Sequence, residues 1–273
     1  MPLSAFLLAL AAAVLHAGWN TLLARSRDVL AATTVALVLS VLLFAPVSAA
    51  TWDVDAAAVP WIAASALLEI VYFVLLTTAY SRSDLSLVYP VARGSAPVLV
   101  LAGAAIAGAT VGVAQALGVL LVGGGILLVR GVGGNTDVRG VVLAVVIGAA
   151  IAGYTLVDKE GVQHAAVIPY LELVLAPAAL AALVWHAASG RVPALRKELG
   201  WPTVGAAVFA FAAYGFVLWA LTLASAPSVA AVRETSVLFA VALGASVLHE
   251  PVGRSRASGA VLVVAGIALV ALG

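Results

Sequence analysis

Long apolar runs make up almost the whole chain, and this feature limits its possible folds more than any other. Only short breaks containing charged, proline or glycine residues separate the runs; 64% of all residues are hydrophobic and 9% are charged. Soluble domains contain about 25% charged residues, and one of this size could not cover its surface with so few polar groups. A soluble enzyme, a nucleic-acid-binding protein and a disordered chain are therefore excluded.

The lengths of the runs predict an all-α integral membrane protein with ten transmembrane helices. A spanning helix needs about 20 apolar residues, and the runs lack the alternation of transmembrane β-strands. The first run is interpreted as an uncleaved helix, because no basic region precedes it. The predicted helices cover residues 3–23, 29–50, 58–80, 86–107, 111–130, 139–157, 166–187, 201–223, 228–248 and 255–272.

Charged residues between these helices predict an orientation in the membrane. One set of alternate loops carries ten basic residues: Arg25, Arg27, Arg82, Arg130, Arg139, Arg191, Arg196, Lys197, Arg254 and Arg256. The other side holds both termini and only Lys159 as a basic residue, together with Asp53, Asp55, Asp158 and Glu160 in its loops. Because positively charged loops stay in the cytoplasm, both termini are predicted to be non-cytoplasmic.

Several short segments recur along the chain. Residues 91–96 (VARGSA) resemble residues 231–236 (AVRETS) at an offset of 140, and residues 17–20 resemble residues 152–155. Residues 91–96 and residues 231–236 are each followed by an apolar helix and then by a helix with two glycines seven residues apart. These glycines are Gly118 and Gly125 after the first segment, and Gly259 and Gly266 after the second. Such spacing is typical of close helix packing.

These recurrences predict two five-helix repeats, residues 1–134 and 135–273. Because five is an odd number, the second repeat would be inverted in the membrane relative to the first. Inverted repeats around a central site are a recurring plan of secondary transporters.

Three segments resemble the EamA-type permeases of the drug/metabolite transporter superfamily. They are residues 15–20 (LHAGWN), residues 89–97 (YPVARGSAP) and Glu250 within LHEP. The chain departs from the family at residues 108–110 (GAT), where the first repeat would carry a glutamate. The resemblance implies a metabolite transporter with export as the expected direction. Many members of the superfamily keep both termini in the cytoplasm, the opposite of what the loop charges predict here.

Five ionisable residues fall inside predicted helices, where each costs at least ~2.5–3.5 kcal/mol at mid-span: Glu69, Arg93, Glu172, Arg233 and Glu234. Arg93 and Arg233 occupy matching repeat positions, which predicts one arginine on each access route, and arginine grips carboxylates and phosphates with two parallel bonds. The alternative is a structural brace, with Arg93 paired to Glu69 and Arg233 paired to Glu234 or Glu172. Glu69 lies closest to mid-membrane and is the candidate for proton coupling.

Polar and aromatic residues at helical spacing extend this set. His16 and Asn20 are four residues apart, as are Tyr89 and Arg93, so each pair shares a helix face. Two prolines, Pro90 and Pro97, predict a broken helix that lines a cavity. An interfacial Trp19, a hydrogen-bonded interhelical His16 and a purely structural kink are the alternatives. The predicted substrate-binding residues are His16, Trp19, Asn20, Glu69, Tyr72, Tyr89, Arg93, Tyr154, Tyr214, Trp219, Arg233 and Glu234.

Enzyme motifs are missing from the sequence, which contains no nucleophile elbow, zinc-protease motif, Walker A sequence or clustered metal ligands. No catalytic residue, metal or cofactor is expected, and no nucleic-acid partner. The predicted function is secondary transport of a small polar metabolite, amino-acid-like or anionic, across a bacterial plasma (inner) membrane by alternating access with proton coupling. A flippase for an anionic lipid or lipid-linked intermediate, and a non-transporting assembly or sensor component, are the alternatives. The expected partners are the substrate, the bilayer and a proton, with the protein a monomer or homodimer.

Overall fold

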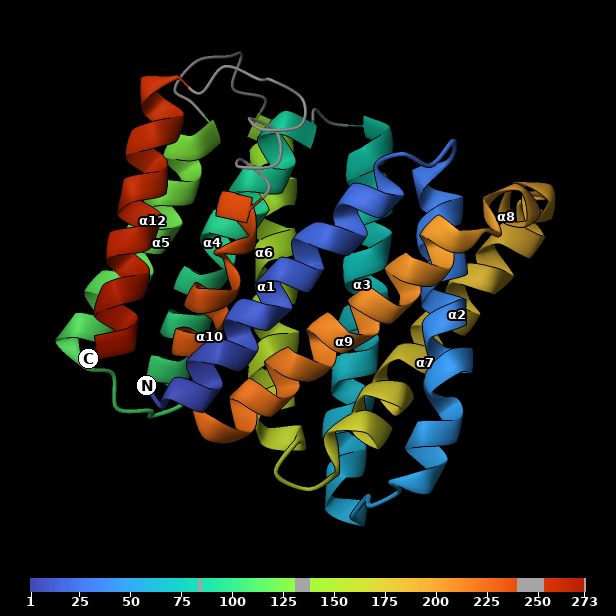
Figure 1. Cartoon of the computed structure of the whole chain (residues 1–273), viewed down its shortest axis with the longest axis horizontal. Coiled ribbons are helices and arrows are strands. Elements are labelled where there is room, and N and C mark those ends of the chain that lie inside the picture. The colour runs from blue at the N-terminus through green and yellow to red at the C-terminus, as the bar shows by residue number, and fades with distance from the viewer. Residues whose placement is uncertain (83–84, 131–137, 240–252, 273) are drawn as a thin grey trace.

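A computed structural model describes residues 1–82, 85–130, 138–239 and 253–272, and this part of the chain is all-helical (Figure 1). Eight of its helices are long and apolar enough to cross a membrane, and a ninth, over Val113–Val129, is apolar but shorter. The helices are α1 (Leu3–Leu23), α2 (Val29–Ala50), α3 (Val59–Arg82), α4 (Leu85–Ile106), α5 (Val113–Arg130), α6 (Val138–Gly161), α7 (Val167–Ala188), α8 (Val192–Glu198), α9 (Trp201–Leu223), α10 (Ala226–Arg233) and α12 (Arg254–Leu272), with a 3-10 turn, η1, at Ala56–Ala58.

The prediction of an all-helical membrane protein is confirmed, and most helix ends lie within two residues of their predicted positions. The ends of α6 and α10 differ more. The predicted helix 139–157 stopped at the first charged residue, whereas α6 continues to Gly161 and takes Asp158 out of the predicted outer loop into the helix. Its charges have partners from other helices, so they do not end it.

The predicted break in the fourth helix is wrong. Pro90 and Pro97 both lie inside one continuous helix, α4. A proline removes a single backbone donor, and packing of α4 against α5 and α6 holds the rest of the helix in place.

The predicted continuous helix 228–248 is also wrong in its first part. α10 ends at Arg233, a turn follows at Glu234 and Thr235, and the chain is helical again at residues 236–239. In the turn, the amides of Glu234 and Thr235 donate to Ala231 and Val232, three residues back, instead of four. Residues 240–248 and the motif residue Glu250 lie outside the described residues.

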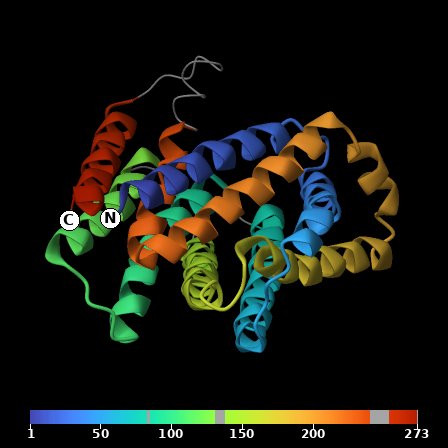
Figure 2. The same cartoon turned by 60° about the horizontal axis from the view of Figure 1, so that its bottom comes forward.

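The helices form two layers with a pair of helices at each side (Figures 1 and 2). α1 and α9 run side by side along one face, and α3, α4 and α6 lie behind them. α5 packs on α12 at one side, and α2 packs on α7 at the other. The interior between the two layers is therefore bounded by α1, α3, α4, α6, α9 and α10.

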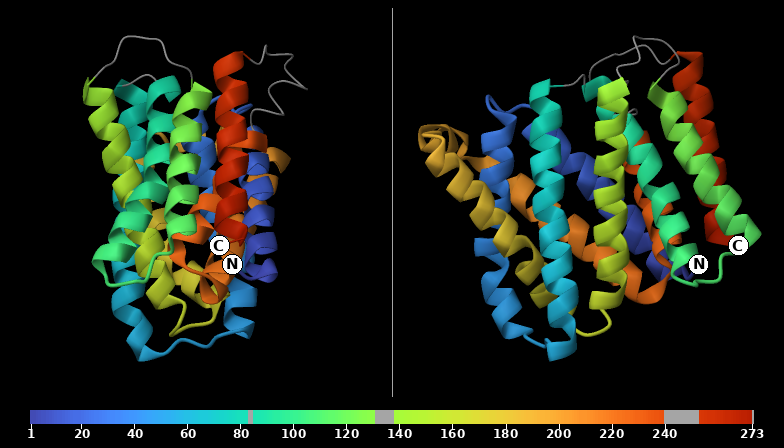
Figure 3. Two further views of the ribbon diagram at one scale, coloured as in Figure 1. Left: turned by 90° about the vertical axis from the view of Figure 1, so that its left-hand side faces the viewer. Right: turned by 180° about the vertical axis from the view of Figure 1, so that it is seen from behind.

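Both termini lie at the same end of the molecule, and α8 lies at the other (Figures 1 and 3). The ammonium group of Met1 donates to the Ala271 carbonyl at 3.0 Å. At the same end the α6–α7 and α2–α3 connections are joined by backbone bonds: Ala166 N donates to Asp53 O at 2.7 Å, and Asp55 N to His164 O at 2.9 Å. Backbone hydrogen bonds therefore tie connections from both halves of the chain together at this end.

Glycines bring α5 and α12 into close contact, as their spacing predicted. A Cβ atom added at Gly259 would lie 2.6 Å from the Gly125 carbonyl oxygen, and one added at Gly118 would lie 2.6 Å from the Gly266 oxygen. Only glycine allows the backbones to approach this closely.

Candidate functional site

A buried glutamate holds the two predicted arginines. Glu234 is 0% exposed, and its Oε2 lies 2.8 Å from Arg93 Nε and its Oε1 lies 3.8 Å from Arg233 Nε. Arg93 Nη2 also donates to the Ser236 hydroxyl at 2.7 Å. The turn after α10 therefore presents Glu234 and Ser236 to α4. The two arginines converge on one carboxylate instead of occupying separate access routes, and Arg93 pairs with Glu234 instead of Glu69.

This sharing leaves Arg233 incompletely bonded. Its side chain is 8% exposed, yet its Nε and Nη2 atoms have no hydrogen-bond partner among the described residues. A buried charge is costly unless it is paired and hydrogen-bonded. The guanidinium of Arg233 is thus available for a second anionic group.

Three tyrosines from three helices form a row beside the arginines. The ring centroids of Tyr72 (α3) and Tyr154 (α6) are 6.2 Å apart, and those of Tyr154 and Tyr214 (α9) are 6.0 Å apart. Tyr154 interacts electrostatically with both Arg93 and Arg233. The row brings together three predicted site residues from both halves of the chain.

Asp158 lies at the end of this row and was not predicted as a site residue. It is 1% exposed and accepts three hydrogen bonds, from the hydroxyls of Ser65 at 2.6 Å, Tyr214 at 2.7 Å and Tyr170 at 2.9 Å. Its position four residues after Tyr154, on the same helix face, is the sequence signal that could have identified it.

Glu69 completes the polar cluster from α3. It is 4% exposed and interacts with Tyr214, Asp158 and Arg233. The site thus has a cationic part at Arg93 and Arg233 and an acidic part at Glu69 and Asp158, with the tyrosine row between the two.

The described contacts tie the other predicted residues to this cluster to different degrees. His16 (α1) is half-buried and interacts electrostatically with both arginines, and the amide of Asn20 donates to its carbonyl at 2.7 Å. Tyr89 is 41% exposed and lies under the guanidinium of Arg93, with 6.0 Å between Cζ and the ring centroid. Of the last two, Trp19 meets this set through His16, and the contacts of Trp219 lie elsewhere.

Trp19 packs against Leu23 and its neighbours on α2 and α9, and its ring meets that of His16 at a centroid distance of 5.0 Å. Trp219 is 38% exposed and pairs with Phe216. It follows Tyr214 by five residues, which turns it about 140° around α9, away from the tyrosine row. Within the described residues, no group of histidine and acidic side chains could hold a metal ion.

Comparison with known proteins identifies the second half of the chain. Residues 138–272 match the EamA-like transporter family. The chain carries an EamA-like transporter domain. This family belongs to the drug/metabolite transporter superfamily, whose members are membrane transporters and not enzymes. No curated protein matches the chain.

A solved crystal structure shares the fold over the full length. It superimposes with a TM-score of 0.75 at 16% sequence identity, covering 100% of this chain and 98% of that one. It is described only as the crystal structure of a protein, so the likeness concerns the fold alone.

The EamA domain supplies half of the cluster. Tyr154, Asp158, Tyr214, Arg233 and Glu234 lie within it. The residues that meet them from outside the domain are His16, Glu69, Tyr72 and Arg93. The polar cluster therefore requires both halves of the chain.

Proposed function

We propose that this EamA-domain protein is a secondary transporter that moves a small zwitterionic, amino-acid-like metabolite across a bacterial plasma membrane by alternating access. The observation that carries the proposal is the buried guanidinium of Arg233, whose Nε and Nη2 atoms have no hydrogen-bond partner in the described residues. A substrate carboxylate would supply the missing acceptors in a bidentate geometry. An ammonium group on the same substrate would meet Glu69 and the faces of the tyrosine rings.

The pairing of helices supports two inverted five-helix repeats, residues 1–134 and 135–273. In such a molecule the helices α1 to α5 correspond, in order, to α6, α7, α9, α10 and α12. Each contact between two helices then has a counterpart between the two corresponding helices. The packing of α1 on α9 is matched by that of α6 on α3, and the packing of α4 on α6 by that of α10 on α1. The packing of α3 on α7 is matched by that of α9 on α2.

We further propose that transport is coupled to protons, with Glu69 as the group that takes up and releases the proton. Glu69 is buried among other charged groups of the cluster and lies close to the middle of α3. Carboxylates in such positions mark proton pathways in membrane transporters. Export is the proposed direction.

The substrate proposal is tested with purified protein in liposomes, by counterflow of radiolabelled amino acids. Arg233→Lys keeps the charge and loses the bidentate fork, so the substrate affinity should fall about tenfold, and Arg233→Ala should abolish counterflow. Arg196→Ala, which removes an exposed arginine on α8, is the matched control and should transport normally. Unchanged affinity in Arg233→Lys, or equal transport of amines that lack a carboxylate, would contradict carboxylate recognition.

The same liposomes separate the proposal from the alternatives of the sequence analysis. Translocation of fluorescent anionic lipids without amino-acid counterflow would support a flippase. Absence of both activities for all tested compounds, from protein that remains folded, would favour a non-transporting component.

A further inference from the structure

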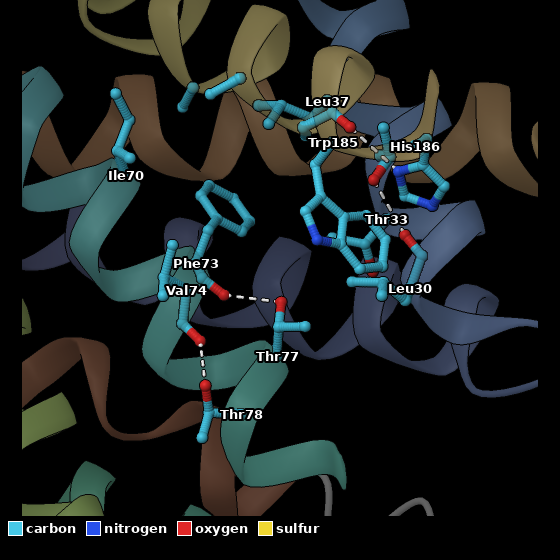
Figure 4. A pocket seen from close by; sticks show the side chains of 14 residues that line it. Leu30, Thr33, Leu37, Ile70, Phe73, Val74, Thr77, Thr78, Trp185 and His186 are labelled. Atoms are coloured by element: carbon cyan, nitrogen blue, oxygen red, sulfur yellow. Dashed lines mark hydrogen bonds between the residues drawn. The ribbon is translucent and has the colours of Figure 1, made fainter. Parts of the chain in front are cut away.

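A pocket separate from the polar cluster lies between α2, α3 and α7, in their halves nearer α8 (Figure 4). Its volume is about 280 Å³, and α3 and α7 diverge toward this end of the molecule (Figure 3). Thr34 of α2, Phe73 of α3 and Ala182 of α7 are among its lining residues. The three helices therefore leave a space between them on the α8 side.

The proposed inverted repeats give this pocket a counterpart at the other end of the molecule. Because α2, α3 and α7 correspond to α7, α9 and α2, the counterpart lies between α2, α7 and α9, toward the end that holds the termini. α2 and α7 both have 22 residues, so Glu172 takes the place in α7 that Thr34 takes in α2. By the same match, Ala182 of the pocket corresponds to Phe44.

Side chains fill the counterpart in this structure. Phe44 stacks on Phe211 of α9, with 4.0 Å between the ring centroids and 5° between the ring planes. A Cβ atom added at Gly215, which corresponds to Phe73 of the pocket, would lie 3.9 Å from a methyl group of Leu171 on α7. The space between the three helices is therefore open on the α8 side and closed on the side of the termini.

Glu172 follows Leu171 on α7 and is 9% exposed. Its Oε2 atom is buried without a hydrogen-bond partner among the described residues, and no ion pair between those residues includes it. A buried carboxylate without a cation or a donor is costly, and ionisable residues inside membrane spans mark the pathways of solutes and ions. A second arrangement of the helices, in which water reaches Glu172, would relieve this cost.

We propose that α2, α7 and α9 separate at the end of the termini in a second state, and that Glu172 then lines a water-filled vestibule and offers its carboxylate to the ammonium group of the substrate. This inference rests on the proposed function, alternating-access transport of an amino-acid-like metabolite. In an inverted-repeat transporter the two repeats exchange their arrangements between the two states. The pocket between α2, α3 and α7 therefore closes when the vestibule opens.

The chain contains no cysteine, so a single introduced cysteine reports access to water without background. Leu175 is buried three residues from Glu172, on the same side of α7. In liposomes that perform amino-acid counterflow, charged methanethiosulfonate reagents on both sides should modify Leu175→Cys. Leu180→Cys, at an exposed position of the same apolar helix, should stay unmodified because charged reagents do not enter lipid. If Leu175→Cys does not fold, Ser40→Cys on α2, which corresponds to Ala178 of the pocket, replaces it.

Two reagents of opposite charge test the carboxylate. The cationic reagent carries a trimethylammonium group, which represents the ammonium group of the substrate. Carboxylates in a cleft concentrate cations, so adding Glu172→Gln to Leu175→Cys should lower the ratio of the cationic to the anionic modification rate about tenfold. Glu160→Gln, an exposed carboxylate at the same end, is the control and should leave the ratio unchanged. An unchanged ratio in Glu172→Gln would overturn the role of Glu172.

A wedge in the pocket tests whether the two spaces exchange. Ala182→Phe fills the pocket and opposes its closure, so modification of Leu175→Cys should slow about tenfold. Leu180→Phe, at an exposed position outside the pocket, should not change it. Unchanged modification in Ala182→Phe would overturn the proposal.

Counterflow in the same liposomes separates this inference from the proposed function. A Leu175→Cys protein that transports amino acids and stays unmodified would show that the vestibule is wrong, and the transport function would stand. Absence of counterflow in the unsubstituted protein would contradict the proposed function, and the vestibule with it.

Discussion

Glu234 links residues that are far apart in the sequence. It pairs with Arg93 at 2.8 Å across the interface between α4 and the end of α10. Removing one partner of a buried ion pair costs about 3–5 kcal/mol, because the other charge stays buried without compensation. A transport cycle that separated this pair at every turnover would face a similar cost, so we expect α4 and α10 to move together.

Replacement of Asp158 should destabilise the fold. In Asp158→Asn an NH2 group replaces one carboxylate oxygen and opposes the hydroxyl donors bound there, either Tyr214 at Oδ2 or Ser65 and Tyr170 at Oδ1. We expect this to lower the free energy of unfolding by about 1–3 kcal/mol. Tyr214→Phe should cost about 1 kcal/mol. Thermal unfolding in detergent measures both. Asp53→Asn, at an exposed position, is the control, and a melting temperature of Asp158→Asn equal to that of the control would contradict the structural role.

Replacement of Glu69 should remove the pH dependence of transport. Glu69→Gln keeps the size and polarity of the side chain but cannot exchange a proton and no longer offers a charge to the substrate ammonium. Counterflow should therefore continue with a weaker substrate affinity and at a rate independent of pH. Counterflow measured between pH 5.5 and 8.5 tests this, with Glu160→Gln, an exposed carboxylate at the end of α6, as the control. A Glu69→Gln protein with normal pH dependence would place the coupling group elsewhere.

Helical spacing and the rarity of charge inside apolar runs were sufficient to predict most of the cluster. Arg93, Arg233, Glu234, Glu69 and Tyr72 were found in this way, whereas Tyr154 and Tyr214 were found from the internal repeat. Asp158 was missed because the run Asp158-Lys159-Glu160 resembles a loop. It is accommodated inside α6 by partners from other helices, including the Leu221 carbonyl that accepts from Lys159 Nζ at 2.6 Å. Such tertiary partners leave no local trace in the sequence.

At the scale of the elements, the length of an apolar run determined where most helices begin and end. The turn at Glu234 and Thr235 could not be predicted, because the residues on both sides are as apolar as those of an unbroken helix. The turn depends on tertiary contacts, since it brings Glu234 and Ser236 to Arg93. The short α8 is likewise held by distant residues: Arg191, just before it, pairs with Asp28 at 2.6 Å, and Glu198 accepts from the Asp28 amide at 3.0 Å.

The contact between α5 and α12 should depend on single glycines. Gly125→Leu would place side-chain atoms against the backbone of α12, where a Cβ atom alone would lie 2.7 Å from the Gly259 oxygen. We expect the helices to separate, with a loss of about 1–3 kcal/mol from overpacking, measured as a lower melting temperature in detergent. Gly124→Leu is the matched control, because nothing lies within 4 Å of a Cβ atom there. Equal melting temperatures for the two variants would show that the close approach is not required.

At the scale of the whole molecule, the orientation in the membrane is the most direct prediction. The end that holds both termini should face away from the cytoplasm, because ten basic residues flank the helices at the opposite end. A C-terminal green fluorescent protein fusion, which folds only in the cytoplasm, should stay dark, whereas alkaline phosphatase at the same site should be active. The reverse result would show that the loop charges do not control insertion of this chain.

The position of the two termini has a consequence for how such a chain can be assembled. Met1 and Ala271 are joined by a hydrogen bond of 3.0 Å, so a few added residues would connect α12 to α1 and make the path of the chain a closed ring. In a closed ring neither half of the chain comes before the other. A permuted gene that begins at residue 135 and continues through such a connection into residue 1 would encode the same helix neighbours in the opposite order. The order in which the two halves occur in the gene is therefore a matter of ancestry, and it is not imposed by the packing.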